Sequence, residues 1–213
     1  MTNRKQRLFR GCVLVAIASS LCIALAAQID AQTGGRPQYA PGGLLRLPVG
    51  FESWVFVGSN LGLSYKPDLP VTDARERARA RPAQEPQLFH NVYIDPEAYA
   101  YFAATRQFPD PTILVMEIFK ADAKDPKDGV LATGVFNGER VGLEVAVKDT
   151  RRPPSQPPVT TPWAYYTFQN PSASGPMRTT APPDDPFCEA CHKQHASMDN
   201  VWVQFYPTLR KLQ

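Results

Sequence analysis

Short apolar segments with the composition of β-strands recur along this chain, and proline-rich stretches separate them. Val141–Lys148 (VGLEVAVK) alternates with a period of two, which is the pattern of a half-buried strand. Thr112–Phe119 (TILVMEIF) is nearly all apolar or β-branched, which also favours a strand. Further strands are expected at Trp54–Gly58, Phe89–Ile94 and Trp163–Phe168. Val130–Phe136 is expected to pair between Thr112–Phe119 and Val141–Lys148.

Helices are expected at only a few places. Asp95 followed by Pro96 is typical of a helix start, and Glu97–Arg106 then reads as an amphipathic helix of about three turns. The polar connection 65–88 has an Arg/Ala/Glu-rich middle that predicts a short surface helix, and Pro186–Gln213 is expected to be helical around its cysteines. This order of elements predicts a mainly β (α+β) fold, in which an antiparallel sheet carries a few packed helices.

The N-terminus has the composition of an export signal. Its first ten residues carry four basic side chains and no acidic one, the apolar run Gly11–Ala27 follows, and Ala24-Leu25-Ala26 has the spacing of a signal peptidase site. The run is close to the lower limit for crossing a bilayer, so a retained membrane anchor is the alternative. We expect a signal peptide at 1–27, a flexible leader at 28–43 and one domain at 44–213, in a periplasmic protein with no membrane attachment after cleavage.

The formal charge changes when the signal is removed. The full chain has 23 basic and 20 acidic residues, and the signal accounts for four of the basic ones, which leaves 19 against 20. No basic stripe remains after processing, so we expect no nucleic-acid partner.

Residues 188–192 read Cys-Glu-Ala-Cys-His, which is the C-x-x-C-H signature of c-type haem attachment. The spacing suits this chemistry, because two thiols add to the two vinyl groups on one edge of the porphyrin and the histidine then lies beneath the iron. The other two cysteines, Cys12 and Cys22, fall within the expected signal. We therefore predict one covalent haem c at Cys188 and Cys191, with its iron bound by His192.

Other uses of the two cysteines fit the sequence less well. A structural disulfide is possible in an oxidising compartment. A thioredoxin-like pair would lie near the start of a βαβ unit, whereas only 21 residues follow His192, and a zinc site would need a second pair. His195 is one turn further on and could also face the ring, although a surface position is the simpler interpretation.

With the haem motif in place, the chain resembles the cytochrome P-460 family and its relative cytochrome c′-beta. The resemblance extends from about Trp54 to Leu209 and rests on several separated motifs in the same order. These are Asn91–Pro96 with Tyr99, Phe108–Asp110, Val141–Asp149, Trp163–Tyr166, Cys188–Lys193 and Phe205–Arg210.

This resemblance implies a mostly antiparallel β fold, usually a homodimer, with one five-coordinate haem c. Cytochromes P-460 oxidise hydroxylamine, using a lysine cross-linked to the porphyrin edge and a distal carboxylate as base, whereas the c′-beta relatives bind nitric oxide and carbon monoxide on an apolar distal side. The carboxylate position matches Glu144. The lysine position holds Met116, a thioether that cannot attack as an amine does, and Lys120 lies further along the same strand face. The chain is therefore more similar to a methionine-bearing c′-beta branch, for which peroxidase-like chemistry is the suspected activity.

The two candidate distal residues also have simpler interpretations. Alternation places Glu144 on a strand face with the small residues Gly142 and Ala146, which would let a flat macrocycle approach, but solvent exposure is the alternative. Met116 could pack in the core, lie against the haem edge or bind iron as a sixth ligand. Met198 follows His192 too closely for a distal ligand, and His90 is either near the pocket or an ordinary strand-end histidine.

Together these features predict an exported mono-haem cytochrome with an open distal site. It would oxidise or reduce hydroxylamine, nitric oxide or hydrogen peroxide, with Glu144 as acid/base. The alternatives are a cytochrome that binds nitric oxide without turnover and a His/Met electron carrier. The expected partners are a small substrate or gas ligand, a redox partner protein and, from the resemblance, a second copy of the chain.

Overall fold

The computed structural model describes residues 35–63, 87–122, 134–155, 157–168, 178–184 and 186–213. Contacts divide the chain into two units, Met1–Gly34 and Gly35–Gln213, and every described residue belongs to the second. The predicted signal peptide, most of the connection 65–88 and residues 130–133 lie outside the described ranges. Among the described helices, none has both the length and the apolar character that crossing a bilayer requires.

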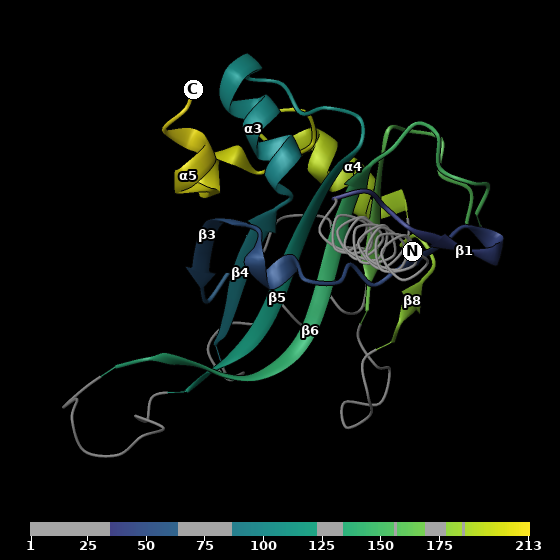
Figure 1. The fold of residues 1–213 in the computed structure, drawn as a ribbon. Helices are drawn as coiled ribbons and strands as arrows, with labels where there is room; N and C mark the ends of the chain where they lie inside the picture. Colours follow the sequence, from purple (N-terminus) through teal and green to yellow (C-terminus); the bar gives the residue numbers. More distant parts are fainter. Residues whose placement is uncertain (1–34, 64–86, 123–133, 156, 169–177, 185) are drawn as a thin grey trace, which may run out of the picture. The chain divides into compact units, whose positions relative to one another are not determined.

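The main feature of the described unit is a five-stranded antiparallel sheet in which sequential strands are neighbours (Figure 1). Its strands in order are β3 (Val55–Leu61), β4 (Leu88–Ile94), β5 (Thr112–Asp122), β6 (Phe136–Lys148) and β7 (Trp163–Thr167). A second antiparallel sheet, here called the small sheet, consists of β1 (Tyr39–Ala40), β2 (Leu44–Arg46) and β8 (Thr180–Ala181). The predicted mainly β (α+β) fold is confirmed.

Strand β6 is longer than the sequence predicts. Phe136 begins β6, which then runs without a break through the alternating segment to Lys148 and pairs directly with β5. The expectation that Val130–Phe136 forms a separate strand between the two is therefore wrong for its described part. The polar residues 137–140 extend the pairing at the end of β5, where the register shifts twice between Ile118 and Ala121. Such long-range pairing overrides the local composition that separates the two apolar stretches.

The helix after β4 begins and ends as its sequence indicates. α3 (Pro96–Thr105) follows the N-cap Asp95, whose Oδ1 accepts a hydrogen bond from the Ala98 N–H at 2.8 Å. The other carboxylate oxygen accepts one from the Ile113 N–H at 3.0 Å, so Asp95 also joins the helix start to β5. Two further helices, α4 (Pro186–His195) and α5 (Pro207–Arg210), come near the C-terminus.

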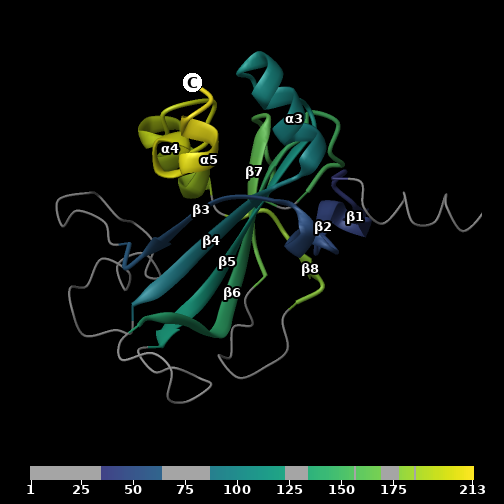
Figure 2. The ribbon, with the colours of Figure 1, turned by 60° about the vertical axis from the view of Figure 1, so that its left-hand side comes forward.

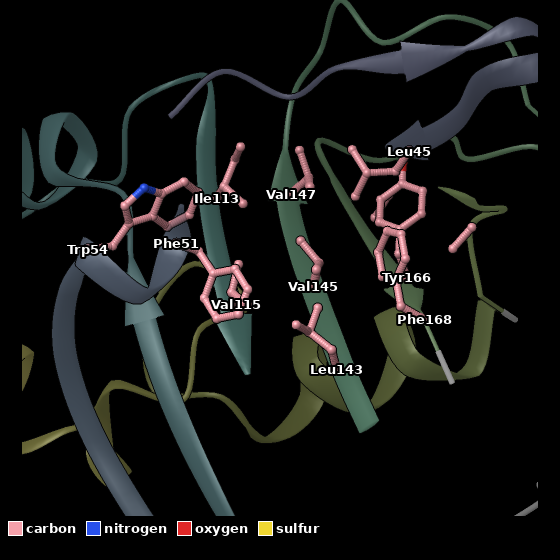
Figure 3. Close-up of a cluster of buried hydrophobic side chains, with 12 residues drawn as sticks. Leu45, Phe51, Trp54, Ile113, Val115, Leu143, Val145, Val147, Tyr166 and Phe168 are labelled. Carbon is pink, nitrogen blue, oxygen red and sulfur yellow. The ribbon is translucent and has the colours of Figure 1, made fainter. Parts of the chain in front are cut away.

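The five-stranded sheet has two covered faces. One, which we call the small-sheet face, packs against Leu45 of β2 and Ala181 of β8, and Figure 3 shows the side chains that meet there from β5, β6 and β7. The other, the helix face, packs against α3 and the C-terminal segment. Figure 2 shows α4 and α5 on one side of the sheet and the small sheet on the other. The alternation of β6 therefore separates two buried environments.

The chain before β2 belongs to the folded unit. Residues 35–43 fall within the segment 28–43 that the sequence predicts to be a flexible leader, but the structure places residues 39–43 in β1 and in the 3-10 helix Pro41–Gly43. The Tyr39 hydroxyl donates a hydrogen bond to Asp149 Oδ2 at 3.1 Å, and burial raises the pKa of this tyrosine. An aromatic side chain with a specific partner explains why these residues pack instead of extending into solvent.

The buried carboxyl group of the cap residue Asp95 should make the stability of the folded protein depend on pH. It is 2% exposed, and burial raises its pKa to about 6, although the backbone N–H groups that it accepts from lower it. Since the folded state holds this proton more tightly than the unfolded chain, the contribution of the group to stability is fully present below about pH 4 and is lost as the pH rises through 6. The difference in unfolding free energy between the parent and Asp95→Asn should fall by up to about 3 kcal/mol from about pH 4 to 7.5 in denaturant titrations. A difference that stays constant with pH would contradict this assignment.

Candidate functional site on the helix face of the sheet

The C-x-x-C-H motif lies on α4, where the helical repeat brings its three side chains to one side. Cys191 and His192 come three and four positions after Cys188, which are the spacings of neighbours on a helix surface. α4 contacts β7, and Cys188 packs against the cluster on the helix face that includes Met116 and Ala146. The motif is therefore directed at the sheet face that carries the predicted distal residues.

The hydrogen bonds of His192 define its tautomer. Its Nδ1 lies 2.8 Å from the Asn200 carbonyl oxygen, which can only accept, so the Nδ1–H donates. The lone pair is then on Nε2, where it accepts from the Trp202 indole N–H at 3.1 Å. Burial lowers the pKa of His192, while the Asn200 carbonyl and the charge of Glu144 raise it. A neutral imidazole with its lone pair on Nε2 is the form that binds a metal, so this donor set fits a haem iron that takes the place of the Trp202 N–H on Nε2.

The predicted distal pair lies together on the helix face. Met116 and Glu144 are direct partners in the register of β5 and β6, so both side chains leave the sheet on the same side. Met116 is half-buried in the helix-face cluster, and Glu144 is half-buried instead of solvent-exposed. The Glu144 charge contributes to raising the pKa of His192, which means that strand and helix bring the two groups near each other. Both site residues that the resemblance indicated are thus close to the motif.

Tyr206 also lies at this site, which its place in a family motif alone did not indicate. Burial raises the pKa of its phenol, and the charge of Glu144 raises it further. The backbone of Tyr206 and Pro207 passes close to β3 at Gly58. A Cβ added at Gly58 would lie 3.0 Å from Pro207 Cδ and 3.3 Å from Tyr206 Cα. Tyr206 therefore adds a protonated hydroxyl close to the carboxylate.

Further polar side chains follow Glu144 across the sheet. Its register partner on β7 is Thr167, whose hydroxyl donates a hydrogen bond to Asp184 Oδ2 at 2.7 Å. Asp184 is fixed in turn by its backbone N–H, which donates to the Tyr165 carbonyl at 2.7 Å. Acidic and hydroxyl groups thus extend from the candidate site to the residues that precede α4.

The remaining candidates have different surroundings. His195 stacks on Trp202 with 6.4 Å between ring centroids, on the proximal side. His90 is buried on β4 opposite Ile118, one pleat away from the pair formed by Val92 and Met116. Lys120 is 48% exposed and pairs with Glu139 at 2.6 Å, so it lies away from the site.

Sequence reasoning also missed the residues that orient His192. Its ring packs against Tyr165 with 4.2 Å between centroids, and Asn200 and Trp202 hydrogen-bond its two nitrogens. The Asp199-Asn200 dipeptide was the available signal, because these residue types tolerate positive φ and favour tight turns.

Comparison with known proteins identifies the family of the chain. A search of curated proteins found no match for the chain. The sequence model of the family described as Cytochrome P460 matches residues 48–203, which include the C-x-x-C-H motif, Met116 and Glu144. This match covers most of the chain and implies binding of haem c, without distinguishing cytochrome c′-beta within the family. The chain belongs to the cytochrome P460 family.

Proposed function

We propose that this chain is a mono-haem c-type cytochrome that oxidises or reduces a small molecule at an open distal site. Hydroxylamine, nitric oxide and hydrogen peroxide are the candidate substrates. The observation that carries the proposal is the position of Glu144 and Met116, which are adjacent on the sheet face towards which α4 directs Cys188 and His192. A carboxylate and a neutral histidine on facing elements are the groups that such a site needs on its two sides.

The residues of α4 would hold the cofactor. The thiols of Cys188 and Cys191 would add to the two vinyl groups of one haem, and His192 Nε2 would bind its iron. The bound haem would supply the electron-transfer capacity and one coordination position for the substrate. The protein contributes the neutral tautomer of His192, which the Asn200 carbonyl fixes.

Glu144 is the proposed acid/base. Hydroxylamine must lose protons as it loses electrons, and peroxide needs a proton moved from one oxygen to the other before its O–O bond breaks. A carboxylate can accept and return such protons when it lies within hydrogen-bond reach of the substrate. The hydroxyl of Tyr206 remains protonated because of burial and the charge of Glu144, so it can donate a hydrogen bond to an oxygen that gains negative charge.

Met116 distinguishes this site from one with a lysine cross-link. Its thioether is half-buried beside Glu144, where it can pack against the haem edge, undergo oxidation or bind iron. The last role would make the protein a His/Met electron carrier, which is the second candidate function. The apolar neighbours of Met116 on the same face, Leu114 and Ala146, would also suit a site that binds nitric oxide without turnover.

The coordination of the ferric iron tests these functions. An absorption and EPR spectrum of the purified ferric protein is expected to be high-spin, because an open site leaves the iron with one strong axial ligand from the protein. A low-spin spectrum that becomes high-spin in Met116→Leu, a substitution that conserves volume, would instead establish the electron carrier. If the parent is high-spin, addition of hydrogen peroxide or hydroxylamine separates turnover from simple binding of nitric oxide.

Cellular location and assembly are part of the same proposal. Export to the periplasm through the segment 1–27 predicts that the mature protein begins near residue 28, which N-terminal sequencing would measure. The proposed homodimer predicts twice the monomer mass in sedimentation, and turnover requires a redox partner protein that exchanges electrons with the haem.

A further inference from the structure

We propose that Asp199 is a positioning residue for His192, because it holds the turn whose carbonyl group accepts the Nδ1–H hydrogen bond. This inference rests on the proposed function, since it takes His192 as the iron ligand. It assigns a role in orienting that ligand to Asp199, Lys148 and Trp163, which act on the imidazole through the turn.

The turn has an unusual backbone that its sequence suits. Asp199 and Asn200 have φ values of 44° and 61°, and the Val201 N–H donates to the Met198 carbonyl at 2.7 Å, which closes the turn. Two consecutive residues with positive φ are typical of type I′ turns, and Asp and Asn are among the few residue types other than glycine that tolerate them. The geometry presents the Asn200 carbonyl to two donors, His192 Nδ1 at 2.8 Å and the Tyr165 hydroxyl at 3.3 Å.

The Asp199 carboxylate fixes this turn to the sheet through both oxygens. Oδ2 accepts from Lys148 Nζ at 2.8 Å, at the end of β6, and Oδ1 accepts from the Trp163 indole N–H at 3.1 Å, at the start of β7. Neither anchor is a loose surface group. Lys148 also donates to the Phe108 carbonyl at 2.8 Å, and Trp163 is 1% exposed with its ring edge against Phe108.

The strength of the Nδ1 hydrogen bond affects the iron through the imidazole. A carbonyl that accepts from Nδ1–H raises the basicity of Nε2, and a displaced carbonyl lowers it. Because the position of Asn200 depends on the anchored Asp199, weaker anchoring should reduce electron donation from His192. The reduction potential of the haem should then become more positive, and the iron–histidine bond should weaken.

The test uses the haem-loaded Asp199→Asn protein. Asparagine tolerates positive φ and keeps one oxygen acceptor, so it removes the charge that binds Lys148 without breaking the turn. We expect a lower iron–histidine stretching frequency in the resonance Raman spectrum of the ferrous protein and a more positive reduction potential. Lys148→Met, which leaves Asp199 in place, should shift both quantities in the same direction and provides a second variant if the first loads haem poorly.

A matched variant serves as the control. Asp110→Asn removes another carboxylate that accepts hydrogen bonds across a loop, from the N–H and hydroxyl groups of Thr150. It should leave the iron–histidine stretching frequency and the reduction potential unchanged.

Unchanged frequency and potential in both Asp199→Asn and Lys148→Met would overturn the inference while leaving the proposed function intact. Absence of an iron–histidine band in a parent protein whose ferrous iron is five-coordinate and high-spin would instead remove His192 as the ligand, and the proposed function would fail with the inference.

Discussion

The Glu144→Gln protein is expected to turn over hydrogen peroxide or hydroxylamine about 10²–10⁴-fold more slowly than the parent, which is the usual contribution of a well-placed acid/base. Glutamine has nearly the same size and keeps an oxygen acceptor, but it cannot take up a proton. Because the substitution acts on the proton-transfer step, kcat should fall much more than KM rises. Steady-state rates measured on protein with a full and unchanged Soret band would give this ratio.

Strand β6 offers a matched control for this substitution. Glu139 is near the start of the same strand, but its side chain is 66% exposed and pairs with Lys120. Glu139→Gln should therefore have the rates of the parent protein, because an exposed ion pair contributes little. If Glu144→Gln also has these rates with every candidate substrate, Glu144 is not the acid/base, and the carboxylate near His192 and Tyr206 has a structural role.

The second large effect is expected at the cysteines. The double variant Cys188→Ala/Cys191→Ala should release all of its haem into acidified organic solvent, whereas the parent should retain all of it after denaturation. The reason is that two thioether bonds are the only covalent links proposed between porphyrin and chain. The measurement is the haem absorbance of the solvent and protein phases.

The residue between the cysteines provides the comparison. Ala190 is exposed on α4, so Ala190→Ser should leave the haem fully attached. Each single cysteine variant should keep one thioether and thus also retain haem on denaturation, with a pyridine haemochrome band shifted from that of the parent. Complete loss of haem from the denatured parent would show that the motif does not bind haem covalently and would exclude the proposed mode of attachment.

Features that depend on neighbouring residues could be predicted from the sequence. The cap of α3 needs only Asp95 and Pro96, the motif on α4 needs only five residues, and the buried alternation of β6 needs only its own period. The length of β6 could not be predicted, because pairing with β5 determines where it begins. The residues of one strand do not show how far along the chain its partner strand continues to pair with it.

The candidate site shows the same limit. The alternation in β6 placed Glu144 and Val145 on opposite faces of the strand. It left open whether the face that carries Glu144 was exposed to solvent or covered by other elements. The answer depends on residues about 40 to 60 positions later in the chain, which bring His192 and Tyr206 to the same face. The resemblance to a known family supplied Glu144 and Met116 before the structure did. Neither source indicated the turn at Asp199, since its role arises from contacts with Lys148 and Trp163.

The order of these elements along the chain has a consequence for biosynthesis. Synthesis supplies the residues of β3 to β7, which include Met116 and Glu144, before those of α4 and of the turn that orients His192. The half of the pocket that would face the substrate is thus made first, and the half that would anchor the iron is made last. A chain that ends after Phe168 would contain the residues of all five strands but not the three residues proposed to hold the cofactor. We therefore expect haem attachment to be one of the last steps in the maturation of this protein.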